Sequence, residues 1–183
     1  MRETEVVPRS LRFVLIQDEA FFICQNGRRM KVKNILQSQY LAALAMFKQA
    51  VVQCPPEIWD DEQDRDKFWY IAYHTLRFAH QYLKAKDKGY PRWEQRPYSK
   101  PGVPFSKEET LEKLSQVEQD VLEQIPLMNL EEKTGATGAL ANKLELQIYN
   151  IRHIQQHTGE LYQRLSATDA KLTWASKRTK EKK

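Results

Sequence analysis

The feature that most constrains the fold is the run of residues 139–165, which carries apolar side chains at helical spacing. Its predicted apolar arc consists of these positions: Leu140, Leu144, Ile148, Ile151, Thr158 and Leu165. A helix of this length exceeds the average for globular proteins. The run therefore predicts a long helix whose apolar arc packs against the rest of the chain.

Three earlier runs, residues 32–52, 66–84 and 106–124, have the same helical periodicity. Pro55 and Pro56 end the first of them, because proline lacks a backbone N–H and restricts the residue before it. Together with the long C-terminal run, these segments predict an all-α fold, a four-helix bundle.

Residues 86–105 separate the second run from the third and are rich in proline, glycine and aromatic residues. Loops of this length are uncommon in compact domains. Two compatible interpretations stay open: a lid that shapes a pocket, and an ordered crossover whose aromatic side chains pack on the end of the bundle. Ser106 and Glu109 form a capping-box pattern that predicts the start of the third helix, and Pro126 predicts its end.

Residues 1–30 do not share the helical pattern. Residues 11–16 and 20–24 are β-prone and are followed by a turn signal at residues 25–28. The first 30 residues are therefore predicted to be an N-terminal extension. A short hairpin, an extended arm used in dimerisation and a segment unrelated to the core fold are the open alternatives. The helical bundle is predicted to span residues 31–168.

Charge is concentrated at the C-terminus. Residues 177–183 hold five basic residues and one glutamate, and so carry four of the five net positive charges. Such a tail is usually solvated, so residues 169–183 are predicted to be basic and disordered. The rest of the chain is close to neutral, and nucleic acid is therefore not favoured as a partner.

Composition narrows the class further. With 183 residues, of which 41% are hydrophobic and 29% charged, the chain suits one soluble domain. No apolar run approaches the length of a membrane span, and the N-terminal residues lack a secretory pattern. Cys24 and Cys54 show no pairing signature, which favours reduced thiols and a cytoplasmic location.

Two of the four histidines, His153 and His157, lie four residues apart within the long run. This spacing places both imidazoles on one helix face, where one cation can reach both rings. The pair is predicted to lie beside the apolar arc, at the seam with a neighbouring helix. Such a pair is also common as plain polar surface, and that alternative stays open.

The other two histidines lie together in the run of residues 66–84. His74 lies within about 60° of both Ile71 and Phe78, at the edge of the predicted inner face. His80 lies about 180° from Ile71 and is predicted to point away from the core. His74 is therefore the candidate to complete a three-histidine site. A core histidine bonded to a tyrosine or glutamine is the alternative.

A three-histidine site has recognisable chemistry. Neutral imidazoles suit Zn²⁺, Ni²⁺, Cu²⁺ and Fe²⁺, and three protein ligands on zinc leave one position open, as in catalytic sites. That position can lower the pKa of a bound water or hold a thiol as its thiolate. Glu160 follows His153 by seven residues on the same flank and is a candidate base or ligand-orienting residue. A plain surface charge is the alternative for Glu160.

Trp59 and residues 67–76 and 152–161 resemble segments of the DinB-like superfamily of metalloenzymes, over about residues 32–165. In that family one histidine of the second helix and a pair in the last long helix bind a divalent metal. Carried over residue by residue, the implied ligands are His74, His153 and His157. The resemblance also implies up-down-down-up connectivity, with the long crossover between helices 2 and 3, and often a dimer.

Gln156 departs from the family pattern, because many relatives have a further histidine at this position. The spacing of four residues between His153 and His157 is kept. Characterised relatives include S-transferases that use bacillithiol, mycothiol or glutathione, and a maleylpyruvate isomerase. The resemblance thus implies a metal-dependent transferase or hydrolase acting on a small thiol or electrophilic substrate. Its cofactors would be a divalent ion (Zn, Ni, Mn or Fe) and a low-molecular-weight thiol. Glu160 and Tyr73 are the candidate catalytic residues.

The expected partners are a small-molecule substrate and a second copy of the chain, without a membrane. Two rival hypotheses stay open. The first is a non-catalytic dimeric bundle whose histidines only pack or bind metal adventitiously. The second is a binder of nucleic acid or of an acidic partner through the basic tail.

Overall fold

The computed structural model describes residues 21–23, 29–63, 65–84, 104–134 and 140–178. In these segments two short strands and five helices follow one another in this order: β1 (Phe21–Ile23), β2 (Arg29–Lys31), α1 (Val32–Gln53), α2 (Pro56–Trp59), α3 (Phe68–Leu83), α4 (Lys107–Leu127) and α5 (Lys143–Leu165). The fold is mostly helical, in agreement with the predicted all-α class. None of the helices described has an apolar stretch long enough to cross a membrane.

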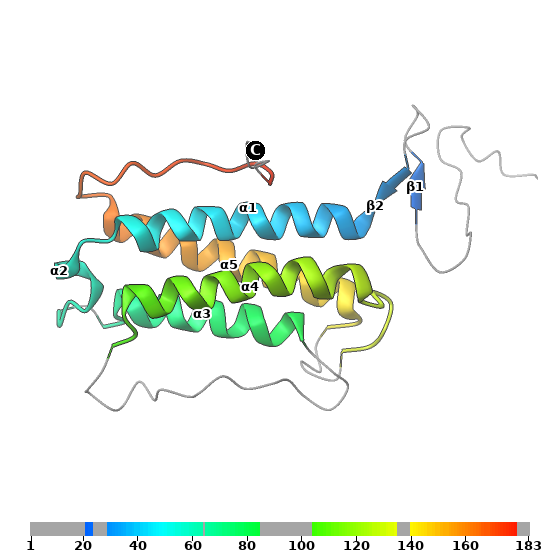
Figure 1. Cartoon of the computed structure of the whole chain (residues 1–183), viewed down its shortest axis with the longest axis horizontal. Coiled ribbons are helices and arrows are strands. Elements are labelled where there is room, and N and C mark those ends of the chain that lie inside the picture. The colour runs from blue at the N-terminus through cyan, green and yellow to red at the C-terminus, as the bar shows by residue number, and fades with distance from the viewer. Residues whose placement is uncertain (1–20, 24–28, 64, 85–103, 135–139, 179–183) are drawn as a thin grey trace, which may run out of the picture.

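The four long helices lie side by side, with α2 as a short connection at one end (Figure 1). Helix α1 packs against α4 and α5, and α3 packs against the same two helices. Strands β1 and β2 pair antiparallel next to the start of α1, at the opposite end from α2.

The core forms because each long helix presents an apolar stripe at steps of three and four residues. Its buried side chains include, from α1 to α5, Tyr40, Leu44, Phe47, Val51, Phe68, Leu76, Leu83, Leu114, Val117, Val121, Ile125, Ile154, Leu161 and Leu165. Each large apolar side chain buried in this way contributes about 1.5–3 kcal/mol. The stripes therefore fix how the helices face one another.

The buried face of α5 differs from the predicted arc. Ile148, a member of that arc, is 48% exposed, whereas Gln147 and Asn150 are fully buried. Each amide has a partner on another helix: Tyr40 donates a 2.6 Å hydrogen bond to Oε1 of Gln147, and Nδ2 of Asn150 donates to the carbonyl of Ala79 at 3.1 Å. Oδ1 of Asn150 is buried without a hydrogen-bond partner among the residues that the structure describes. The arc was wrong at this point because polar side chains count as exposed in a pattern, while partners on other helices allow these two to be buried.

His80, predicted to point away from the core, is 4% exposed. Its Nδ1 lies 2.6 Å from Oδ2 of Asp120 on α4, and Nζ of Lys84 lies 2.7 Å from Oδ1 of the same carboxylate. The prediction is wrong because α3 is covered on two sides, by α5 and by α4. A residue opposite one apolar stripe can therefore still be buried.

Helix α4 starts with the predicted capping box. Oγ of Ser106 accepts from the Glu109 N–H at 3.1 Å, and Oε2 of Glu109 accepts from the Ser106 N–H at 2.8 Å. The helix ends at Leu127, one residue past Pro126, its predicted end. It tolerates this proline because Nε2 of Gln37 donates to the carbonyl of Leu122 at 3.3 Å, the acceptor that proline leaves without its helical donor.

Parts of the predicted extension and crossover lie outside the described residues. Of the crossover, residues 86–103 are not described, so the lid and crossover interpretations stay predictions. Its last residue, Phe105, accepts a 2.8 Å hydrogen bond through its carbonyl from Nε1 of Trp59. Of the N-terminal extension, only the β1–β2 pairing, with Phe22 opposite Met30, can be described.

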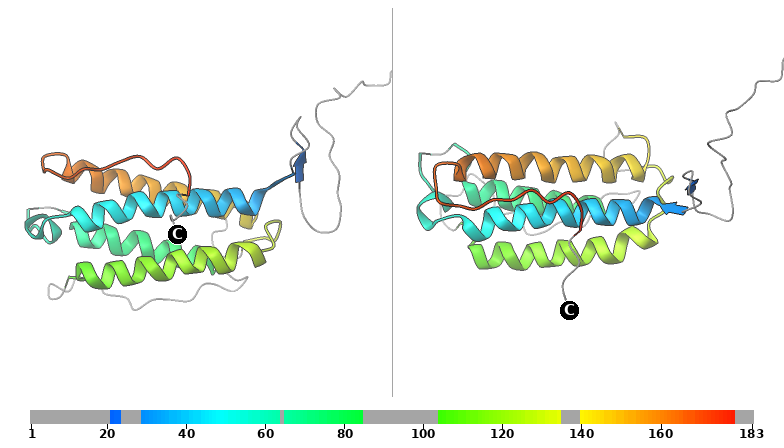
Figure 2. Two further views of the ribbon diagram at one scale, coloured as in Figure 1. Left: turned by 45° about the horizontal axis from the view of Figure 1, so that its top comes forward. Right: turned by 90° about the horizontal axis from the view of Figure 1, so that it is seen from above.

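Residues 169–178, part of the tail predicted to be disordered, lie extended along α1 (Figure 2). Gln49 of α1 accepts from the Thr173 N–H at 2.8 Å and donates to the Thr173 carbonyl at 3.3 Å. Gln53 binds both backbone groups of Lys171 in the same way, at 2.7 and 3.1 Å. The two registers match, because four helical residues rise about 6 Å and two extended residues span about 6.6 Å. The described part of the tail therefore differs from the prediction.

Candidate metal centre

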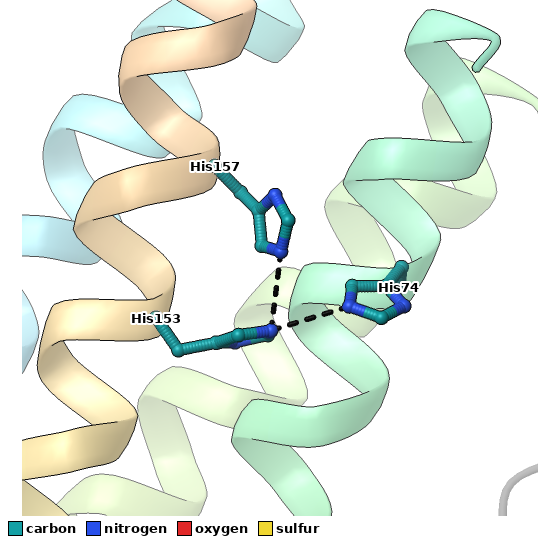
Figure 3. Close-up of side chains that lie close together, drawn as sticks. All are labelled: His74, His153 and His157. Carbon is teal, nitrogen blue, oxygen red and sulfur yellow. Dashed lines mark hydrogen bonds between the residues drawn. The ribbon is translucent and has the colours of Figure 1, made fainter. Parts of the chain in front are cut away.

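The three predicted ligands meet at the seam between α3 and α5. His74 comes from α3, and His153 and His157 come from successive turns of α5 (Figure 3). One ring nitrogen of each residue lies within 4.8 Å of the other two. All three side chains are half-buried. The structure therefore brings together the three residues that the sequence singled out, close enough to hold one metal ion.

The separations of the ring nitrogens fit a single ion. Nε2 of His153 lies 3.2 Å from Nε2 of His74 and 3.2 Å from Nε2 of His157. Tetrahedral zinc, with Zn–N bonds of about 2.0–2.1 Å, requires ligand nitrogens roughly 3.3–3.4 Å apart. Figure 3 shows these nitrogens pointing toward one another from the two helices. The donor set therefore fits a divalent cation with little rearrangement.

Hydrogen bonds between the rings explain the two 3.2 Å separations of the Nε2 atoms less well than a shared cation does. An imidazole nitrogen carries either one proton or one lone pair, so Nε2 of His153 can make one well-formed hydrogen bond. It faces two ring nitrogens at equal distance. A cation shared by three lone pairs satisfies all of them at once, which favours a metal site.

Glu160 orients one of the three rings. Its Oε2 lies 2.8 Å from Nδ1 of His157, one turn earlier on α5. An ionised carboxylate only accepts hydrogen bonds, so Nδ1 of His157 carries a proton, and a metal ion that displaces the proton from Nε2 would find the Nε2 lone pair directed at the cluster. Burial raises the pKa of Glu160, but the hydrogen bond and charge of His157, helped by Gln156 and Arg164, outweigh this and hold the pKa below its usual value.

The other two rings are kept neutral by their surroundings. Burial, together with the nearby charges of His157 and Arg77, lowers the pKa of His74 to about 4. Burial also lowers the pKa of His153 to about 4, with smaller effects from His157 and His74. Both imidazoles are therefore deprotonated at neutral pH, which is the form that binds a metal.

Aromatic rings pack around the cluster. The ring of Phe78 lies 4.7 Å from that of His74 and 5.7 Å from that of His153, between centroids. Tyr149 stacks on His153 at 6.3 Å, and Tyr70 lies 6.3 Å from His74. These contacts restrict rotation of the imidazoles, so the ligand set is held in place before any ion arrives.

A pocket of about 400 Å³ opens beside the cluster and has His74 and His157 in its wall. The other lining residues are Asp66, Tyr70, Ile71, Glu160, Gln163 and Arg164. A pocket of this volume suits a small molecule. Two of the three histidines are therefore accessible from this pocket.

The two predicted catalytic candidates differ in placement. Glu160 lies in the pocket wall and is bonded to His157. Tyr73 is 4% exposed, and its ring packs against Phe105 with centroids 5.0 Å apart. Among the residues described, Tyr73 is not part of the pocket lining. Glu160 therefore lies beside the cluster and Tyr73 packs against Phe105, and a catalytic role of either residue stays a prediction.

Sequence reasoning missed two further residues of the pocket, Tyr70 and Arg164. Their spacing from the histidines along each predicted helix could have identified both residues. Tyr70 precedes His74 by four residues, and Arg164 follows His157 by seven, so each lies on the same helix face as a ligand.

Comparisons of the chain with protein-family models, with curated proteins and with solved structures found no match. The class of molecule is therefore defined by its own features: a mostly helical chain with a three-histidine cluster beside a small-molecule pocket.

Proposed function

We propose that the chain is a four-helix-bundle metalloprotein of the DinB-like type, which holds one divalent ion on His74, His153 and His157. It uses this ion to act on a small thiol or electrophilic substrate. The observation that carries the proposal is the convergence of three Nε2 atoms, with one nitrogen 3.2 Å from each of the other two. That separation is close to the edge of a tetrahedral zinc site.

The positions of the helix ends support up-down-down-up connectivity. Nζ of Lys107, at the start of α4, donates to the carbonyl of Cys54 at the end of α1. Nζ of Lys33, at the start of α1, donates to the carbonyl of Pro126 near the end of α4. Because the short α2 also returns the chain from the end of α1 to the start of α3, helices α3 and α4 run in the same direction. This is the order that the DinB-like resemblance implies.

Each side chain around the cluster has a definite task in this proposal. Glu160 holds the Nδ1 proton of His157 and so keeps the Nε2 lone pair directed at the ion. Phe78 packs on His74 and His153 and limits the water around them. A bound divalent ion would supply a Lewis acid that lowers the pKa of a water or thiol beside it.

The donor set also ranks the metals. Three neutral imidazole nitrogens suit Zn²⁺, Ni²⁺ and Fe²⁺, whereas Mn²⁺ prefers carboxylate and other oxygen ligands. We therefore propose zinc, nickel or iron ahead of manganese. The homodimer, the cytoplasmic location and the thiol cofactor stay predictions.

Elemental analysis of the tag-free protein after dialysis tests the proposal. The wild-type protein is expected to hold about one divalent ion per chain, and His74→Ala and His153→Ala to hold none. Arg152→Ala is the control, because Arg152 is an exposed residue of the same helix. A wild-type protein that stays metal-free after incubation with zinc, nickel and iron would overturn the proposal. The histidines would then have a packing role only.

A further inference from the structure

Two buried amide side chains of α5 bind the backbone of α3. Nε2 of Gln147 donates to the carbonyl of Tyr82 at 3.1 Å, and Nδ2 of Asn150 donates to the carbonyl of Ala79 at 3.1 Å. Both amide side chains are fully buried. The two acceptors lie three residues apart on α3, as the two donors do on α5, and their order along the chain is reversed. The pair of hydrogen bonds therefore selects one axial register of α5 on α3.

This register decides where the histidines meet. Continuing in the same steps of three residues places His153 of α5 opposite Leu76, within one turn of His74 on α3. The ring of Phe78, the neighbour of Ala79, lies 5.7 Å from that of His153 between centroids. A slip of one residue would move His74 by about 1.5 Å along the axis, whereas metal–ligand distances tolerate about 0.2 Å. The site therefore requires this register.

His153 depends on the register more than His157 does. Glu160, on the same helix, binds Nδ1 of His157 and so orients that ring locally. Nδ1 of His153 is buried and has no hydrogen-bond partner among the residues that the structure describes. The position of the His153 ring is therefore set by the placement of α5 and by the neighbouring rings of Phe78 and Tyr149.

Asn150 is not the side chain that packing alone would select. Its Oδ1 is buried without a partner among the described residues, and an unpaired buried acceptor destabilises a fold. A leucine of similar size would avoid that loss. Buried polar side chains of this kind are best attested where they select one register of packed helices.

We propose that Gln147 and Asn150 are positioning residues of the metal centre. They hold α5 in register with α3, so that Nε2 of His74 reaches the two histidines of α5. This inference rests on the proposed function, because it explains how the same site is assembled. Neither amide binds the ion, and both act through the helix that carries two of the three ligands.

The test compares two changes of buried polar side chains on α5. Asn150→Leu keeps the approximate size of the side chain and removes the donor to α3. Thr158→Val is the matched control, because Thr158 is also fully buried but donates to the carbonyl of Ile154 on its own helix, at 2.8 Å. Both full-length variants and the wild type are titrated with Co²⁺ in competition with a chromophoric chelator. The visible d–d absorption of the bound Co²⁺ reports its ligands and geometry.

Asn150→Leu is expected to bind Co²⁺ about tenfold more weakly than wild type and to show an altered d–d spectrum. The altered spectrum reports the loss of His74 as a ligand, which a general loss of stability would not produce. Thr158→Val is expected to keep the wild-type affinity and spectrum. Urea unfolding of each variant shows that the protein titrated is folded.

The outcomes separate this inference from the proposed function. Wild-type affinity and spectrum in Asn150→Leu, or equal weakening in Thr158→Val, overturns the positioning role and leaves the metal site standing. A wild-type protein that binds no Co²⁺ overturns the proposed function and this inference with it.

If Asn150→Leu does not fold, Gln147→Met decides by the same comparison. That change removes the donor to Tyr82, while the Tyr40 hydroxyl keeps the backbone carbonyl of residue 147 as an acceptor at 3.3 Å. Weaker Co²⁺ binding with an altered spectrum supports the positioning role, and an unchanged affinity contradicts it.

Discussion

Nδ1 of His157 lies 2.8 Å from Oε2 of Glu160, one turn further along α5, while Nε2 of the same ring faces His153. Glu160 therefore holds a proton on Nδ1 of His157. His157 and His153, on the same helix, supply two of the three ring nitrogens of the cluster. The arrangement is local to α5 and is set by helical spacing, because residues three and four apart are neighbours on a helix.

Glu160→Gln is expected to weaken metal binding by about 10- to 100-fold, because the carboxylate raises the basicity of His157 and holds its ring in place. The amide can still accept from Nδ1, so the fold should be retained. Competition with a chromophoric chelator measures the affinity. Arg152→Ala, an exposed neighbour on α5, is the control. Equal affinity of Glu160→Gln and wild type would contradict the orienting role.

Metal removal is expected to destabilise the protein. An ion that binds the native state at 100 times its Kd contributes about 2.7 kcal/mol. For a chain of this size that corresponds to a rise in Tm of roughly 5–10 °C. Calorimetry with chelator and then with added zinc measures the difference. His153→Ala should show no such rise, and a rise of equal size in this variant would place the zinc elsewhere.

The metal-free protein is expected to lose stability as the pH falls from about 6.5 to about 4. The native pKa of His74 and of His153 is about 4, below the ordinary value of 6.5. In this window the unfolded chain binds protons that the native state does not. Protonation therefore stabilises the unfolded state relative to the native state. Urea unfolding at several pH values checks this. The double variant His74→Gln with His153→Gln should show a flatter profile.

Removal of Asp120 is expected to cost about 3–5 kcal/mol of unfolding free energy, because His80 and Lys84 then lose their buried counter-charge. Burial raises the pKa of Asp120, but its hydrogen bonds from His80 and Lys84 outweigh this and hold the pKa below its usual value. Urea unfolding of Asp120→Ala measures the loss. Glu123→Ala, an exposed change on the same helix, should stay within about 0.5 kcal/mol of wild type.

Residues 169–178 are expected to detach from α1, without unfolding of the bundle, when the side chains that bind their backbone are removed. Gln49→Ala with Gln53→Ala deletes the side chains that bind the backbone of Thr173 and Lys171. Amide hydrogen exchange of residues 169–178 should then speed up, while exchange in α3 stays unchanged. Faster exchange throughout the core would show that the segment supports the whole fold. Lys48→Ala, an exposed change on α1, is the control.

Much of the helical structure was predictable because it depends on spacing within short stretches of chain. The periodicity of residues 32–52 predicts α1 to within a residue at each end. The capping box of Ser106 and Glu109 predicts the start of α4, because both partners lie within one turn. The pairing of His153 with His157 follows from the same local geometry.

Other features depend on residues that are far apart in the sequence. Nε2 of His74 lies 3.2 Å from Nε2 of His153 across 79 positions of the chain, a distance that only the packing of α3 on α5 sets. Burial of His80 and of Gln147 depends on partners from other helices. The position of His80 opposite Ile71 and the polarity of Gln147 were therefore both misleading.

The sequence by itself therefore determined the four long helices, the ends of α1, the start of α4 and the candidate ligand residues, because backbone hydrogen bonds and side-chain periodicity act over a few residues. The tertiary structure decided which polar side chains are buried and how closely the three Nε2 atoms converge. It also brought Arg164 and His157 into one pocket with residues of α3. Those outcomes depend on long-range packing of apolar stripes, which fixes distances that no local pattern contains.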